Sequence, residues 1–89
     1  MLFVVDIDIK DSARKSTFAT GISQLGNTHQ MFENTWLLDS NRQRNDIYTS
    51  LRANLNDSDL ILIIQTSRDD LSGWVPKSTI EWLNEHNYQ

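Results

Sequence analysis

The stretch Leu2–Lys10, which reads LFVVDIDIK, decides the fold because it has the pattern of a β-strand. Side chains alternate between the two faces of a strand, so every second residue points the same way. One face is apolar throughout and consists of Phe3, Val5, Ile7 and Ile9. The other face carries Asp6 and Asp8, two carboxylates near the C-terminal end of the strand. Two interpretations are open for this face: a solvated sheet surface, or a metal or acid–base site.

The size and composition of the chain bound what it can be. Its 89 residues predict one domain, residues 1–89, with one modest core. The absence of cysteine excludes disulfides, thiolate catalysis and cysteine zinc sites, and it fits a cytoplasmic location. No run approaches the roughly 18 apolar residues of a membrane span, so no membrane partner is expected. A formal net charge of −4 argues against a broad, non-specific grip on nucleic acid, although a local basic patch is compatible with it.

A helix is expected after the first strand. Asp11-Ser12 has the chemistry of an N-cap, and Gly26 suits the C′ position that ends a helix. Between them, one apolar stripe repeats at helical spacing, at Phe18, Ile22 and Leu25. The segment also contains Thr17, Thr20 and Gly21, which are weak helix formers. Docking against a sheet must therefore stabilise this helix.

The middle of the chain predicts a hairpin and a second helix. Strand formers at His29–Phe32 and Thr35–Asp39 flank a bend at Glu33-Asn34. Ser40-x-x-Gln43 then matches a capping box, which is the start signal of a helix. An apolar stripe follows at helical spacing, at Ile47, Leu51 and Leu55.

The last third predicts one more strand and a third helix. Leu60–Ile64 is apolar on both faces, so this strand is either central in the sheet or covered on its second face. Gly73–Pro76 predicts a turn in which Trp74 is an aromatic anchor. Ser78-x-x-Glu81 matches a second capping box, and the helix that it starts is expected to end near His86.

The order of these elements is β-α-β-β-α-β-α, which predicts an α+β fold. It is the ferredoxin-like βαββαβ arrangement, with a four-stranded antiparallel sheet and an extra C-terminal helix. The two helices between strands cover one face of such a sheet. The opposite face then carries Val4, Asp6 and Asp8 beside one side of Leu60–Ile64. A half-apolar bare face on a small domain favours a cover, and homodimerisation through it is the economical solution.

Three segments carry a resemblance to a known family. They are the strand ending in an aspartate and a basic residue (Val5–Lys10), the glycine–strand–Thr-Trp pattern (Gly26–Leu38), and Asp59–Ile63 with the tail motifs Gly73–Lys77 and Trp82-Leu83. Together they resemble the SinR-like proteins, which are relatives of the CRISPR-associated small endoribonuclease (the second universal Cas protein) and of the VapD toxin. The resemblance implies a ferredoxin-like homodimer. It also implies that Asp8 matches an aspartate which, in the CRISPR relatives, lies near the dimer axis and is associated with a divalent metal.

The expected function follows from this resemblance and from the residues around Asp8. We expect a homodimeric, nucleic-acid-associated protein, with RNA or DNA as partner and Mg²⁺- or Mn²⁺-dependent endonuclease activity. Asp8 is the candidate catalytic residue, Asp8 and Asp6 are the candidate metal ligands, and Lys10, Arg14 and Lys15 are the candidate nucleic-acid contacts.

A second interpretation stays open. It is a non-catalytic dimeric scaffold or protein-interaction module in a toxin–antitoxin or defence system. The net negative charge favours it, as does Asn34, which stands where the family usually has serine. His29 and His86 are further candidates for acid–base work, and Trp36, Trp74 and Trp82 for base stacking. Solvated or structural roles are favoured for both histidines, and core or tail-docking roles for the tryptophans.

Overall fold

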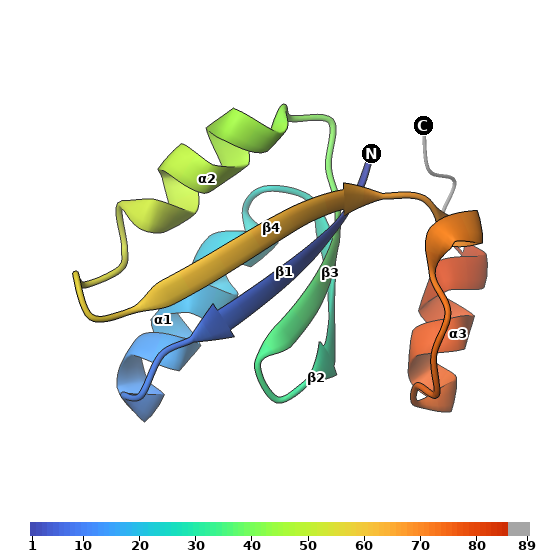
Figure 1. The fold of residues 1–89 in the computed structure, drawn as a ribbon, viewed down its shortest axis with the longest axis horizontal. Coiled ribbons are helices and arrows are strands. Elements are labelled where there is room, and N and C mark those ends of the chain that lie inside the picture. Colours follow the sequence, from blue (N-terminus) through green and yellow to red (C-terminus); the bar gives the residue numbers. More distant parts are fainter. Residues whose placement is uncertain (86–89) are drawn as a thin grey trace.

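The computed structural model describes residues 1–85 and shows the order β-α-β-β-α-β-α (Figure 1). The strands are β1 (Leu2–Asp8), β2 (Asn27–Phe32), β3 (Thr35–Asp39) and β4 (Leu60–Thr66). The helices are α1 (Ser12–Ser23), α2 (Arg44–Arg52) and α3 (Lys77–Glu85), and a 3₁₀ turn at Arg68–Asp70 follows β4. No helix within this range is long and apolar enough to cross a membrane.

The four strands form one antiparallel sheet in the order β2-β3-β1-β4. This order and the two β-α-β connections confirm the ferredoxin-like arrangement with a C-terminal helix. The hairpin is also confirmed, since the chain turns back at Glu33-Asn34 and β3 has the predicted bounds. In the sheet, β1 lies between β3 and β4, which places Asp6 and Asp8 on a central strand.

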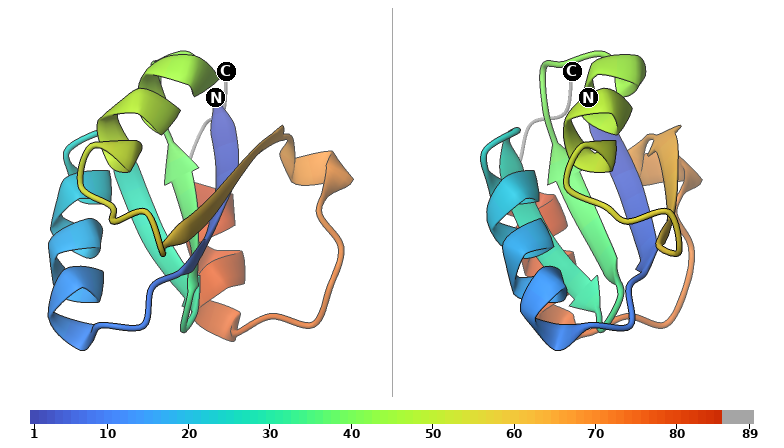
Figure 2. Two further views of the ribbon diagram at one scale, coloured as in Figure 1. Left: turned by 60° about the vertical axis from the view of Figure 1, so that its left-hand side comes forward. Right: turned by 90° about the vertical axis from the view of Figure 1, so that its left-hand side faces the viewer.

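The first face of the sheet is covered by α1 and α2 (Figure 2). All four apolar positions of the β1 stretch are buried there, as the alternation predicts. The ring of Phe18 on α1 meets Trp36 on β3 edge to face, with centroids 5.4 Å apart. The buried residues of this core are Phe3, Val5, Ile7, Ile9, Phe18, Ile22, Trp36, Leu38, Ile47 and Leu51.

The ends of α1 and α2 test the predicted caps. The carboxylate of Asp11 accepts a hydrogen bond from the Ala13 amide at 2.9 Å, which confirms the N-cap. The C′ role of Gly26 is wrong, because α1 ends at Ser23 and none of the described glycines has a positive φ. A Cβ on Gly26 would collide with the carbonyl oxygen of Asp39, so this position needs glycine for close approach to the end of β3.

The predicted capping box at Ser40 is also wrong. Helix α2 begins at Arg44, with Gln43 at the N-cap and no side-chain cap hydrogen bond. The Ser40 hydroxyl instead donates to the Leu25 carbonyl at 2.7 Å and accepts from the Arg42 amide at 3.1 Å. Ser40 thus ties the end of β3 to the loop after α1.

The second face of the sheet is only half covered, and its cover is α3 (Figure 2). Leu83 of α3 packs with Leu2 and Leu37 in a second buried cluster. The residues packed around this cluster are Val4, Met31, Leu71 and Trp82. We call this α3-covered part of the second face, over β2 and β3, the covered half. The predicted helix end near His86 lies outside the described residues.

Strand β4 lies at the edge of the sheet, which excludes a central position, the first of the two alternatives for Leu60–Ile64. On the second face Leu60 is 63% exposed, Leu62 58% and Ile64 49%. Its other side chains, Ile61 and Ile63, pack against the first core. Among the described residues, the apolar run therefore has a cover on one face only.

Candidate functional site

The uncovered part of the second face is the strongest candidate site, and we call it the open half. It consists of alternate residues of two neighbouring strands: Asp6 and Asp8 on β1, and Leu60, Leu62 and Ile64 on β4. The register places Asp6 opposite Leu62 and Asp8 opposite Leu60. Residues directly opposite in antiparallel strands share a face at about 4.5–5.5 Å between Cβ atoms. Each exposed carboxylate thus stands beside an exposed leucine.

Each carboxylate of the open half accepts a hydrogen bond from one neighbouring side chain and remains accessible. The Thr35 hydroxyl donates to Asp6 Oδ1 at 2.7 Å. The ammonium of Lys10 donates to Asp8 Oδ1, also at 2.7 Å, and the Asp8 side chain is 49% exposed. A carboxylate has about four acceptor sites, so each keeps lone pairs for a further donor or a cation.

The donor chemistry of this pair fits a hard divalent cation. Mg²⁺ and Mn²⁺ prefer carboxylate oxygens, and Mg²⁺ often binds through one or two carboxylates while it keeps several waters. Within residues 1–85, no three His, Cys, Asp or Glu side chains gather closely enough to hold a metal ion. A single protomer therefore supplies two ligands from β1 and no third acidic or imidazole group.

The three predicted nucleic-acid contacts lie in different electrostatic settings. Lys10 is freely accessible and stands beside Asp8. Arg14 forms ion pairs with Asp59 and, at 3.7 Å, with Asp11. Lys15 lies 3.7 Å from a carboxylate oxygen of Glu33. Of the three, the structure brings Lys10 to the open half and holds Arg14 in an intramolecular contact.

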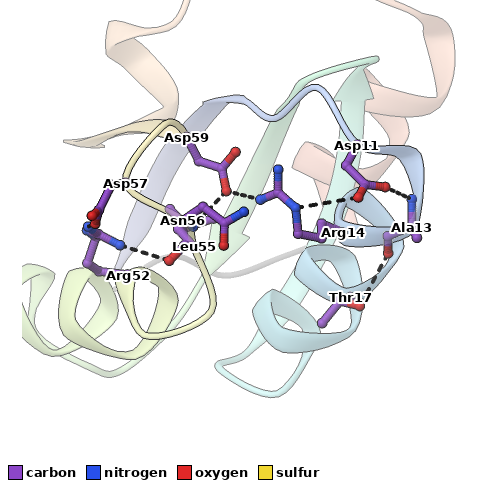
Figure 3. Close-up of polar contacts among 9 residues, drawn as sticks. All are labelled: Asp11, Ala13, Arg14, Thr17, Arg52, Leu55, Asn56, Asp57 and Asp59. Atoms are coloured by element: carbon purple, nitrogen blue, oxygen red, sulfur yellow. Dashed lines mark hydrogen bonds and ion pairs between the residues drawn. The ribbon is translucent and has the colours of Figure 1, made fainter.

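The Arg14–Asp59 ion pair joins α1 to the turn between α2 and β4 (Figure 3). The Asp59 side chain is almost fully buried and also accepts a hydrogen bond from the Asn56 amide at 2.8 Å. The hydrogen bond from Arg14, followed by that from Asn56, lowers the pKa of Asp59 below its ordinary value. The same contact raises the pKa of Arg14. Sequence reasoning did not find this pair, because its members are 45 positions apart and nothing local marks them as partners.

His29 and the tryptophan candidates do not belong to the open half. His29 stacks on Trp82 with centroids 5.8 Å apart, and its Nε2 lies 2.8 Å from the Thr79 hydroxyl. It therefore joins β2 to α3. Trp36 is buried in the first core, whereas Trp74 is 99% exposed, so its predicted anchoring role is wrong. His86 lies beyond the part of the chain that the structure describes.

A groove of about 610 Å³ lies on the covered half, between α3 and the loop that follows β4. Its lining includes Met31, Leu37, Leu71, Trp74, Ile80 and Leu83. Neither Asp6 nor Asp8 lines it. The groove and the carboxylate pair Asp6 and Asp8 thus lie in different halves of the same face.

The fold and the open half together define an α+β, ferredoxin-like protein with an acidic, aliphatic sheet surface. No protein-family model matches the chain, and no curated protein matches it. Among solved structures, it is similar to a crystal structure of a hypothetical protein, TT1823, from Thermus thermophilus. The TM-score is 0.61 at 20% identity, over 84% of this chain and 93% of that one. This likeness supports the fold alone.

Proposed function

We propose that the protein is a cytoplasmic homodimer, formed through the open half, that binds nucleic acid and a divalent cation at the dimer axis. The observation that carries the proposal is the exposed aliphatic row Leu60, Leu62 and Ile64 directly beside Asp6 and Asp8. An isologous two-fold contact buries the same patch on both subunits. It therefore covers the aliphatic row of each subunit and brings the carboxylates of the two subunits together.

The energetics of this contact link dimerisation to a cation. Burying apolar surface stabilises the dimer by roughly 25 cal/mol per Å². Gathering four carboxylates at one axis opposes it, because like charges repel more strongly as water is removed. A bound Mg²⁺ or Mn²⁺ offsets this repulsion. Asp8, with Asp6, from each subunit would hold the ion, and Lys10 would neutralise a neighbouring phosphate.

The chemistry that such a site supports is phosphodiester hydrolysis. A divalent ion at the carboxylates would supply charge neutralisation and an activated water. The residues of the chain would bind and orient: Asp8 would hold the ion, and Lys10, 2.7 Å from Asp8, would bind the substrate phosphate. The resemblance to the CRISPR-associated endoribonuclease family supports Asp8 in this role.

Two measurements test the proposal. Sedimentation velocity, with and without Mg²⁺, should show a concentration-dependent dimer that the ion strengthens. Incubation with single-stranded RNA or duplex DNA should show metal-dependent cleavage that Asp8→Asn removes. Asp69→Asn, a change at an exposed acid outside the open half, serves as the matched control. A strictly monomeric protein in both conditions would overturn the dimer, and cleavage that survives Asp8→Asn would overturn the assignment of Asp8.

A specific observation favours a second candidate, the non-catalytic interaction module. Arg14 and Lys15 are paired with acidic side chains, and the chain carries a net charge of −4, so the positive surface available to a phosphate backbone is small. In that case the same dimer forms, and the open half serves protein association. A dimer that neither retains nor cleaves RNA or DNA at low salt would favour this candidate.

A further inference from the structure

Along Leu60–Ile64, the outer edge of β4 lacks the charged side chains, the proline and the bulge that often protect an edge strand. Its only neighbour among the strands of residues 1–85 is β1. Natural proteins guard such edges with charged side chains, proline, β-bulges or a covering element. The run Leu60–Ile64 has no charge and no proline, and its seven-residue register with β1 contains no bulge.

The register shows which backbone groups β4 presents to the outside. In an antiparallel sheet, the N–H and C=O of one residue point to the same neighbouring strand, and successive residues alternate. The Ile7 amide donates to the Asn34 carbonyl at 2.9 Å. The backbone N–H and C=O groups of odd-numbered β1 residues therefore point to β3, and those of even-numbered residues point to β4. Because Asp6 is opposite Leu62, the backbone N–H and C=O groups of even-numbered β4 residues point to β1. The N–H and C=O groups of Ile61 and Ile63 therefore point away from the sheet.

We propose that this edge pairs with β4 of a second copy, antiparallel and with Leu62 opposite itself. In this register each residue of Leu60–Ile64 faces an aliphatic residue of the partner. The outward groups of Ile61 meet those of Ile63 in the second copy, and each such pair exchanges two hydrogen bonds. A shift by two residues would set Ile61 and Leu60 against Gln65 and Thr66 and lose apolar contact. The register with Leu62 opposite itself therefore pairs the aliphatic residues of β4 with one another.

This contact differs from the dimer of the open half and does not rest on it. The open half is a surface of the sheet, whereas the edge contact extends the sheet in its own plane. The two contacts use different two-fold axes. A protein with two isologous contacts assembles beyond a dimer, into a closed tetramer or a longer array. The edge contact also places two copies of the exposed row Leu60, Leu62 and Ile64 side by side.

A single-cysteine scan tests the register, because the native chain has no cysteine. Leu62→Cys places two thiols opposite each other at a non-hydrogen-bonded position, where Cα atoms lie about 4.5 Å apart and a disulfide fits. Leu60→Cys is the matched control, since its thiols would lie four residues apart, roughly 13 Å. Oxidation should crosslink Leu62→Cys to a dimer and leave Leu60→Cys monomeric. Equal crosslinking of both, or of neither, overturns the register.

Amide hydrogen exchange separates the edge contact from the open half. The amides of Ile61 and Ile63 should exchange at least tenfold more slowly at high protein concentration than at low concentration. Association through the open half alone leaves these amides unpaired and their exchange unchanged, which would overturn the proposal. Ile63→Pro, which removes an outward N–H and none that pairs with β1, should abolish the concentration dependence at Ile61. Ile63→Ala, which also loses the isoleucine side chain but keeps that N–H, should retain the dependence. Since Asp8 is not on this edge, Asp8→Asn should leave the Leu62→Cys crosslink intact.

Discussion

The covered and open halves of the second sheet face both carry aliphatic side chains and differ in what lies over them. Leu37 is fully buried beneath α3, whereas Leu60 on the same face is 63% exposed. A helix is about 10 Å wide and strands are about 4.8 Å apart, so one helix covers about two strands. The first face has two helices for four strands, and the second face has only α3. Within the described residues, β4 and the C-terminal half of β1 are therefore left without a cover on this face.

The largest expected effect contrasts a fully covered ring with a half-exposed one. Phe18→Ala should lower the free energy of unfolding by about 3–5 kcal/mol, because it leaves a cavity against Trp36 in the first core. Phe32→Ala makes the same chemical change on β2, where the ring is 47% exposed, and should cost about 1 kcal/mol. Urea denaturation of both variants checks this. Equal losses would mean that Phe32 is covered in solution.

Next in size is the change that would open the covered half. Leu83→Ala removes the α3 side chain that packs on Leu2 and Leu37, and should cost about 2–4 kcal/mol. Because the first core does not include α3, amide exchange should accelerate in α3 while β1 stays protected. Unfolding of the whole domain together with α3 would show that the two faces are one cooperative unit.

The polar contact beside the first face should give the protein an acid-sensitive stability. The folded-state pKa of Asp59 is lowered, chiefly by the hydrogen bond from Arg14, so the contact stabilises the fold at pH values above the unfolded pKa of about 3.9. This stabilisation is lost as the pH falls through the lower, folded pKa. Thermal unfolding from pH 7 to pH 2 should therefore show a decline in stability at acid pH that is smaller in Asp59→Asn. Asp57→Asn, at a fully exposed carboxylate of the same turn, should retain the wild-type decline.

Local patterns predicted most of the fold because they report which face of an element is buried. The alternation of apolar and polar residues correctly predicted which β1 side chains are buried. The turn residues Glu33-Asn34 predicted the hairpin, and Asp11 predicted the start of α1. The pair Asp6 and Asp8 was likewise placed on the less covered face. These features depend on near neighbours in the chain, which a sequence displays directly.

The features that the sequence did not reveal depend on distant partners. Leu60–Ile64 is apolar on both faces, and this composition does not tell whether the cover comes from the same chain or from another. Gly26 is required by the carbonyl of Asp39, and Arg14 is held by Asp59, in each case through a contact between separate elements. The extent of α3 cover follows from helix width and strand spacing, which no residue pattern encodes.

The smallest expected effect concerns Trp74, at the rim of the groove on the covered half. Its side chain is 99% exposed, so Trp74→Ala should change the free energy of unfolding by less than about 0.5 kcal/mol. The variant should lose the long-wavelength, iodide-quenchable part of the tryptophan emission. Trp36→Phe, at a ring that is only 5% exposed, should remove emission that iodide does not reach. A loss above about 1 kcal/mol on Trp74→Ala, or weak quenching of Trp74, would show that this ring packs against something in solution, and the covered half would then extend further than α3.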